Sequence, residues 1–285
     1  MYQCNEIATK DSIFLEKEQG KTIKRRANDL NGKEWLKYSI SIWSDIRKTK
    51  EEVNLNHPAI FPVELASRLI KIFTCGENDL IFDPFAGIGS TLVAAKQEGK
   101  NSIGFELNPD YVKIANQRLM ELTLFEENKS SHIIYNEDSR KILNLMKEET
   151  VDLVITSPPY WNVLNEKRTA DNKEIRKYSN EDKDLGNIKD YRDFLKELQG
   201  IFSNVYKVQK KGSFCCVIVM DIRKKDKFYP FHIDIVSFMQ EIGYLFEDII
   251  IWDRKQEYNN FRPLGYPFVF RVNKVHEYIL IFKKE

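Results

Sequence analysis

The strongest constraint on the fold is an alternation of short apolar runs and longer amphipathic segments over most of the 285 residues. The apolar runs have the length of strands buried on both faces, and the segments between them repeat apolar residues every three or four positions, as helices do. We predict seven strands, at residues 79–83, 101–107, 132–136, 151–157, 212–221, 244–254 and 276–284. We predict helices at residues 62–73, 90–98, 109–122, 139–146, 191–208 and 231–242.

This order of elements predicts an α/β fold, a doubly wound, Rossmann-like, seven-stranded and mostly parallel sheet. No helix separates the last two predicted strands, so we expect them to pair antiparallel, with the last strand reversed. Residues 56–285 form the predicted main domain, and residues 1–55 form an N-terminal extension. Two irregular segments, 161–188 and 253–274, are longer than ordinary connections and are therefore expected to be either functional or disordered.

Composition excludes several classes of protein. The formal net charge of +1 gives no general attraction to nucleic acid, so contacts to a polyanion must come from local clusters of basic residues. The sequence has no apolar run long enough to cross a membrane, and its first twenty residues lack the apolar core that a signal peptide needs. Its four cysteines have no metal-ligand spacing. We expect a cytoplasmic protein that binds no metal and no membrane.

A glycine-containing loop, "DPFAGIGST", joins the first predicted strand to a helix. Gly87 and Gly89 let the backbone approach a ligand closely, and the helix that begins at Ser90 offers free N–H groups. Glu106 ends the second strand, where a carboxylate can accept both hydroxyls of a ribose. The fingerprint of dinucleotide-binding proteins needs a third glycine, but Leu92 stands there. The loop therefore favours an adenosine-containing ligand without a pyrophosphate, and a purely structural tight turn is the alternative.

Two further segments follow predicted strands. In "NEDSR", Asp138 is placed to reach an adenine amino group, and it is also a suitable N-cap for the next helix. In "VITSPPYW", two prolines end the fourth strand and are followed by two aromatic residues. Proline cannot donate to a sheet and holds the preceding residue extended. The result is a stiff tip, suited to holding a flat ligand, whereas a rigid loop that packs on the core is the alternative.

Taken in order, "DPFAGIGST", "GFELNPDY", "NEDSR" and "VITSPPYW" resemble the S-adenosylmethionine-dependent DNA amino-methyltransferases. The upstream segment "HPAIFP" is similar to the one that covers the methionine end of the cofactor in that family. The resemblance extends over roughly residues 35–120, 132–162 and 189–285, so it makes residues 56–285 the expected methyltransferase catalytic domain. It implies S-adenosylmethionine as cofactor, bound by Phe61, Asp83, Phe85, Ala86, Gly87, Gly89, Ser90, Thr91, Glu106, Asp138 and Ser139.

The resemblance also implies a role for the tip formed by Ser157, Pro158, Pro159 and Tyr160. Enzymes of this family flip the target base out of the duplex, at an unstacking cost of about a few kcal/mol. Tyr160 would then stack on the base, while the Ser157 hydroxyl and the Pro158 carbonyl accept hydrogen bonds from its exocyclic amine. This arrangement directs the nitrogen lone pair at the methyl group, and no cysteine nucleophile is required.

Serine at position 157 favours N4 of cytosine in duplex DNA, because "SPPY" is more often associated with cytosine and "DPPY" with adenine in this family. Methylation of adenine N6, or of a base in RNA, is one alternative, and an inactive cofactor-binding subunit is another. A homodimer and an accompanying restriction endonuclease are further possible partners. No separate recognition domain is visible, so target contacts are expected from residues 1–55, 161–188 and 253–274. Residues 1–55 can also help to cover the cofactor.

Overall fold

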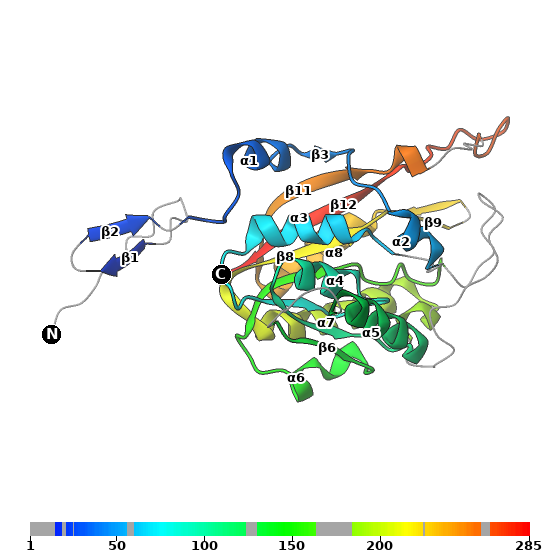
Figure 1. Ribbon diagram of the computed structural model, residues 1–285. Coiled ribbons are helices and arrows are strands. Elements are labelled where there is room, and N and C mark those ends of the chain that lie inside the picture. Colours follow the sequence, from blue (N-terminus) through cyan, green and yellow to red (C-terminus); the bar gives the residue numbers. More distant parts are fainter. Residues whose placement is uncertain are drawn as a thin grey trace.

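A computed structural model gives the fold and describes residues 15–18, 21–24, 26–55, 60–123, 130–163, 184–224, 226–257 and 263–285. Its centre is an eight-stranded sheet with the order β3-β11-β12-β8-β7-β4-β5-β6 (Figure 1). The strands are β3 (Ile42–Trp43), β4 (Leu80–Asp83), β5 (Asn101–Phe105), β6 (His132–Tyr135), β7 (Val151–Thr156), β8 (Gln209–Val219), β11 (Tyr244–Asp253) and β12 (His276–Lys284). Two separate hairpins consist of β1 (Leu15–Glu18) with β2 (Lys21–Lys24), and β9 (Ile222–Lys224) with β10 (Lys227–Tyr229).

The predicted topology is confirmed, with one addition. The seven predicted strands are present, and β12 is antiparallel to both of its neighbours, β8 and β11, while the other pairs in the sheet are parallel. The prediction of seven strands was wrong by one, because β3 joins the edge of the sheet beside β11. A strand of two residues is too short to produce an alternating pattern, so the sequence did not reveal it.

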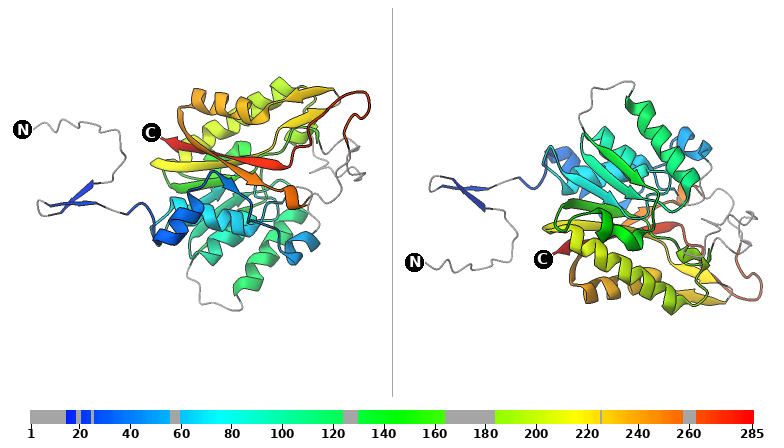
Figure 2. Two further views of the ribbon diagram at one scale, coloured as in Figure 1. Left: turned by 90° about the horizontal axis from the view of Figure 1, so that it is seen from above. Right: turned by 90° about the horizontal axis from the view of Figure 1, so that it is seen from below.

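Helices cover both faces of the sheet (Figure 2). One face carries α3 (Val63–Phe73) and α4 (Ser90–Gln97), with α5 (Pro109–Thr123) beside α4. The other face carries α7 (Tyr191–Val208) and α8 (Phe231–Ile242), with the short α6 (Ile142–Leu145) beside α7. Two more short helices, α1 (Gly32–Tyr38) and α2 (Lys50–Asn54), precede α3. The predicted helix at 139–146 is instead a 3₁₀ turn, η1 (Ser139–Lys141), followed by α6.

The two apolar layers meet the sheet through alternating side chains. Cys215 belongs to the same buried cluster as Phe202 and Phe238 on the α7–α8 face, whereas its neighbour Cys216 belongs to the cluster of Leu65 on the α3 face. Both thiols are fully buried and free. Alternation of this kind explains why β8 appears in the sequence as a continuous apolar run, because both of its faces are covered. It also means that the adjacent cysteines point apart.

Residues before α3 are also part of the folded body. Trp43 and Ile46 are buried in the same cluster as α3. The guanidinium of the buried Arg68 in α3 forms two hydrogen bonds of 2.9 Å with the Asp45 carboxylate, and it holds the pKa of that carboxyl well below its usual range. The predicted boundary near residue 55 stays a prediction. No helix among the described residues is long and apolar enough to cross a membrane.

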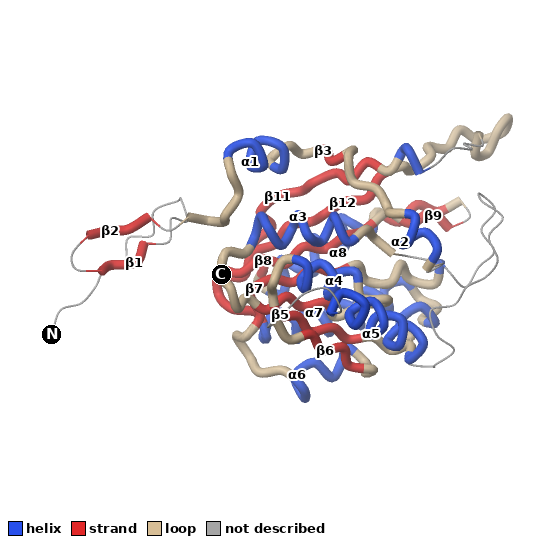
Figure 3. Tube along the Cα trace, viewed as in Figure 1, coloured by secondary structure: helices blue, strands red, loops and turns tan. Residues whose placement is uncertain are grey.

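Connections at the carboxyl ends of the parallel strands gather at one end of the sheet (Figure 3). They include the glycine loop after β4, the tip after β7, the β9–β10 hairpin after β8 and the β11–β12 connection, which contains the 3₁₀ turn η4 (Lys255–Glu257). A fifth segment is the 3₁₀ turn η3 (Leu185–Asn187) before α7. Residues 164–183 and 258–262 of the two predicted irregular segments, and residues 1–14 of the extension, lie outside the described residues.

Candidate active site

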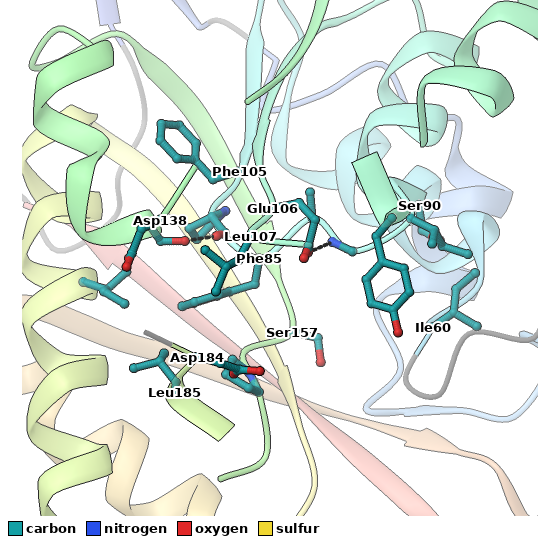
Figure 4. Close-up of a pocket in the computed structure, with 18 of the residues that line it drawn as sticks. Ile60, Phe85, Ser90, Phe105, Glu106, Leu107, Asp138, Ser157, Asp184 and Leu185 are labelled. Carbon is teal, nitrogen blue, oxygen red and sulfur yellow. Dashed lines mark hydrogen bonds between the residues drawn. The ribbon is translucent and has the colours of Figure 1, made fainter. Parts of the chain in front are cut away.

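An open cavity lies at this end of the sheet, beyond β4, β5 and β7, and it encloses about 930 Å³ including solvent at its mouth. Figure 4 shows Glu106, Asp138, Ser157 and Asp184 around this one space, although they come from four different segments of the chain. Its wall consists of Ile60, Phe61, Pro84, Phe85, Ala86, Gly87, Ile88, Ser90, Phe105, Glu106, Leu107, Tyr111, Asp138, Ser139, Arg140, Ser157, Pro159, Asp184, Leu185 and Ile201. A mostly apolar cleft with a few converging polar groups is typical of a small-molecule site.

Most of the residues singled out from the sequence lie in this wall. Eight of the eleven proposed cofactor residues line the cavity, namely Phe61, Phe85, Ala86, Gly87, Ser90, Glu106, Asp138 and Ser139. Of the four proposed catalytic residues, Ser157 and Pro159 line it. The other five residues, Asp83, Gly89, Thr91, Pro158 and Tyr160, lie outside the lining.

The glycine loop curves around one end of the cavity. Gly87 and Gly89 have left-handed φ angles of 52° and 79°, which residues with a side chain rarely adopt. A Cβ atom on Gly89 would lie 2.9 Å from the Cβ atom of Ala115 in α5, so the loop has no room for one. The hydroxyl of Ser90, at the start of α4, is buried and has no hydrogen-bond partner among the described residues. A buried hydroxyl in a cavity wall is suited to a ligand.

Asp83 supports the glycine loop from behind the cavity. Its carboxylate is fully buried and accepts hydrogen bonds from the hydroxyls of Thr91, at 2.6 Å, and Thr156, at 2.7 Å, and from the Phe85 N–H at 3.0 Å. Burial raises the pKa of this carboxyl to about 6, and the three donors oppose the rise. The network joins β4, α4 and β7, so Asp83 and Thr91 hold the loop in place.

Glu106 is the central carboxylate of the cavity wall. One of its oxygens accepts the Gly87 N–H at 2.9 Å, the bond drawn as a dashed line in Figure 4, and the other accepts the Asn108 N–H at 2.8 Å. Burial, helped by the negative charges of Asp83 and Asp184, raises the pKa of this carboxyl to about 7. A concentration of carboxylates in an apolar cleft favours a cationic ligand.

Asp138 and Ser139 form the cavity wall opposite the start of α4. Asp138 is the N-cap of η1, where it accepts the Arg140 N–H at 2.9 Å, and it forms a 2.8 Å ion pair with the Arg140 guanidinium. The Ser139 hydroxyl donates to the carbonyl of Pro84. The capping role considered from the sequence is thus present, and Asp138 also lines the cavity.

The tip after β7 is held by residues from distant parts of the chain. The Tyr160 hydroxyl donates to the Glu277 carboxylate of β12 at 3.1 Å. The Ser157 hydroxyl lies 3.4 Å from the Tyr160 hydroxyl. The Tyr160 ring lies with its plane at 86° to that of Phe231, with ring centroids 6.2 Å apart. Glu277 is 6% exposed and forms an ion pair with Arg254.

Several cavity residues were not found from the sequence. Leu185 and Asp184 come from η3, where Asp184 accepts the Gly186 N–H at 2.8 Å, and Tyr111 comes from the first turn of α5. No motif marks them. Glu277, which lies outside the cavity lining but holds Tyr160, did have a signal, because it is an acidic residue beside the apolar run of the last strand. No group of three or more potential metal ligands occurs among the described residues.

A mostly parallel sheet with a glycine loop and a cleft lined by carboxylates, beyond the carboxyl ends of its central strands, is the arrangement of α/β proteins that bind nucleotide-type ligands. A family model described as "DNA methylase" matches residues 3–117 and 151–285. The chain therefore belongs to this family, the S-adenosylmethionine-dependent amino-methyltransferases of DNA.

Similarity to individual proteins extends over shorter lengths. The chain is similar to the Type II methyltransferase M.BglI of Bacillus subtilis, at 33% identity over 43% of this chain and 34% of that protein. It is similar to M.MthZI of Methanothermobacter thermautotrophicus, at 31% identity over 55% of this chain and 46% of that protein. A putative DNA modification methylase of Thermus thermophilus, complexed with S-adenosyl-L-methionine, is 26% identical over 52% of this chain and 53% of that one, with a TM-score of 0.37. The chain thus spans less than half the length of these curated relatives.

Proposed function

We propose that this protein transfers a methyl group from S-adenosylmethionine to the exocyclic N4 amine of cytosine in duplex DNA. The observation that carries the proposal is the position of Ser157 and Pro159, which line the same cavity as the glycine loop and Glu106. A donor bound by the loop and an acceptor held by the tip would therefore meet in one space. Membership of the DNA methylase family supports this reaction type.

The residues of the cavity fit the proposed cofactor. Its sulfonium and ammonium groups are cationic, and the wall contains the carboxylates of Glu106, Asp138 and Asp184. The unpartnered Ser90 hydroxyl and the free N–H groups at the start of α4 suit the carboxylate of its methionine part. Glu106 uses each oxygen for one backbone N–H, which leaves acceptor capacity for ribose hydroxyls.

When bound, the cofactor supplies an electrophilic methyl group on sulfur. The chain's own residues position the acceptor: the Ser157 hydroxyl and the Pro158 carbonyl accept hydrogen bonds from the amine, so that its lone pair faces the cavity. Tyr160 stacks on the flipped base, and its hydrogen bond to Glu277 fixes where the ring lies. Pro158 and Pro159 keep the acceptors rigid. We also propose that residues 56–285 form the catalytic domain and that residues 1–55 help to cover the cofactor or contact the target.

Tritium transfer tests the proposal directly. The protein is incubated with methyl-labelled cofactor and, in parallel reactions, with DNA or RNA from a methylation-deficient host, and the labelled nucleosides are separated by chromatography. Label in N4-methylcytosine is the expected result. Label in N6-methyladenine would replace cytosine by adenine as the target, and label only in RNA would change the substrate class. Cofactor binding without transfer to any nucleic acid would identify an inactive subunit and contradict the proposal.

A further inference from the structure

The connection between β11 and β12 exposes a set of apolar side chains far from the core. We call its described part, residues 263–275, the aromatic loop. Phe268 and Phe270 are 91% and 93% exposed, Tyr266 is 77% exposed, and Val269 and Val272 are also exposed. Clusters of large apolar side chains with this exposure are uncommon in proteins without a partner at that surface.

Beside this loop lies a hairpin rich in positive charge. We call β9–β10 the basic hairpin, because its described residues, 222–224 and 226–229, include three basic residues, Arg223, Lys224 and Lys227, and one acidic residue, Asp226. The two surfaces touch: Arg271 of the loop forms an ion pair with Asp226 of the hairpin. In addition, the Lys274 ammonium lies 5.0 Å from the centre of the Phe228 ring. The exposed aromatic residues are therefore next to a cluster of cations.

Both surfaces adjoin the tip after β7. The Lys224 ammonium of the basic hairpin lies 4.4 Å from the centre of the Trp161 ring, directly after Tyr160. At the root of the aromatic loop, the Arg254 N–H donates to the Val275 carbonyl at 2.8 Å. In Figure 1 the loop extends beyond the ends of β11 and β12, on the side where β9 lies. A ligand on these surfaces would also reach the tip.

We infer that the aromatic loop and the basic hairpin together bind duplex DNA around the target base. Phe268 and Phe270 enter the base stack beside the flipped base, and the cations of the hairpin contact the phosphates. This inference rests on the proposed function. Charge favours DNA over a second copy of the chain as the occupant, because a twofold interface through this surface would bring two basic hairpins together.

The physical role of the aromatic residues follows from the cost of base flipping. Removing a base from the stack costs about a few kcal/mol, and inserted apolar side chains reduce this cost by occupying part of the space left behind. The loop is well placed for this role, since its two roots lie next to Glu277, which holds Tyr160. The residue that stacks on the extruded base and the residues that enter the duplex would then approach from the same side.

Salt dependence tests the basic hairpin. The variant Arg223→Ala/Lys227→Ala removes two exposed charges, so the slope of log Kd against log salt for a short mixed-sequence duplex should become shallower by about 2. The matched control is Lys147→Ala/Lys207→Ala, which removes two exposed charges near the amino ends of β7 and β8, at the end of these strands opposite to the cavity. An unchanged slope in the hairpin variant, or an equal change in the control, would overturn the inference.

The aromatic loop is tested by Phe268→Ser/Phe270→Ser on a duplex that carries the site methylated by the wild-type protein, mapped by sequencing. We expect kcat/KM to fall at least about tenfold on the paired target and to recover largely on a mismatched target, which is easier to flip. Calorimetric affinity for S-adenosylmethionine should not change. The control is Met120→Ser, because Met120 is 70% exposed near the end of α5, at the opposite edge of the sheet.

Three results would contradict the role of the loop. They are undiminished activity of the double variant, the same loss on paired and mismatched targets, and a change in oligomeric mass by sedimentation, which would assign the surface to a second copy. The failure of this inference can be distinguished from failure of the proposed function. If the wild-type protein transfers no label to DNA, the proposed function fails. If the wild-type protein is active and both variants match it, only this inference fails.

Discussion

Cofactor affinity is predicted to depend on pH through Glu106. Burial raises the pKa of this carboxyl to about 7, helped by the charges of Asp83 and Asp184, while the N–H groups of Gly87 and Asn108 oppose the rise. A cationic cofactor whose ribose hydroxyls donate to Glu106 binds the ionised carboxylate. Protonated Glu106 is therefore the state with weak affinity, and binding should become tighter as the pH rises through 7.

The size of the effect follows from the fraction of protein that is competent to bind. The apparent Kd is the intrinsic Kd divided by the ionised fraction of Glu106. With a pKa of about 7, about a tenth of Glu106 is ionised at pH 6 and about three quarters at pH 7.5. The Kd should therefore fall about eightfold between these two values. The sulfonium charge does not titrate, and an α-amino group of ordinary pKa is still mostly protonated at the upper pH, so the cofactor stays cationic.

Isothermal titration calorimetry measures this affinity directly. Titrations in two buffers with different ionisation enthalpies should also show proton release on binding, largest at the lower pH. The control is Glu106→Gln, which should bind more weakly and with little pH dependence. A wild-type Kd that is the same at pH 6 and pH 7.5, or proton uptake on binding, would refute the role given to Glu106. The Asp83 carboxyl, with a pKa near 6, lies behind the wall, and Asp83→Asn separates its contribution.

Three further substitutions have definite expected outcomes. Tyr160→Ala should leave calorimetric cofactor affinity nearly unchanged while tritium transfer to DNA collapses, and an equal loss of both would contradict the stacking role. Thr156→Val removes a 2.7 Å donor to the buried Asp83 and should lower the free energy of unfolding, measured in urea, by about 1–3 kcal/mol. Gly89→Ala, at a φ of 79° and against Ala115, should lower both the melting temperature and cofactor affinity, whereas unchanged values would show that the loop can adjust.

The sheet could be predicted because most of its strands are buried on both faces. In β8, for example, Cys215 and Cys216 pack on opposite faces, so the sequence shows an unbroken apolar run between amphipathic helices. β3 could not be predicted, because Ile42 and Trp43 join the sheet through pairing with β11, which is more than two hundred residues away along the chain. The predicted helix at 139–146 begins as the 3₁₀ turn η1. This was not predictable, because the spacing of apolar residues does not distinguish a 3₁₀ turn from a turn of α-helix.

The site was predictable where its residues lie next to one another in the sequence. The glycine loop follows β4 and the tip follows β7. Because these strands are parallel neighbours, their carboxyl ends lie at the same end of the sheet. Residues that reach the cavity from elsewhere left no such pattern, as with Asp184 and Tyr111. The burial of Asp83 and Thr91 behind the cavity wall was also not predictable. A motif does not show which of its side chains face the ligand and which face the core.

The ion pair of Glu277 and Arg254 is better explained by positioning than by stability. Burying two charges costs free energy that their attraction often does not recover, so such a pair is weak evidence for a stability role. Here the pair links two sites: Glu277 accepts the Tyr160 hydroxyl, and Arg254 lies at the root of the aromatic loop, where its backbone N–H donates to the Val275 carbonyl. A displacement of the loop would disturb Arg254 and thereby the partner of Tyr160. Binding of DNA by the loop and orientation of the stacking residue are therefore expected to be coupled.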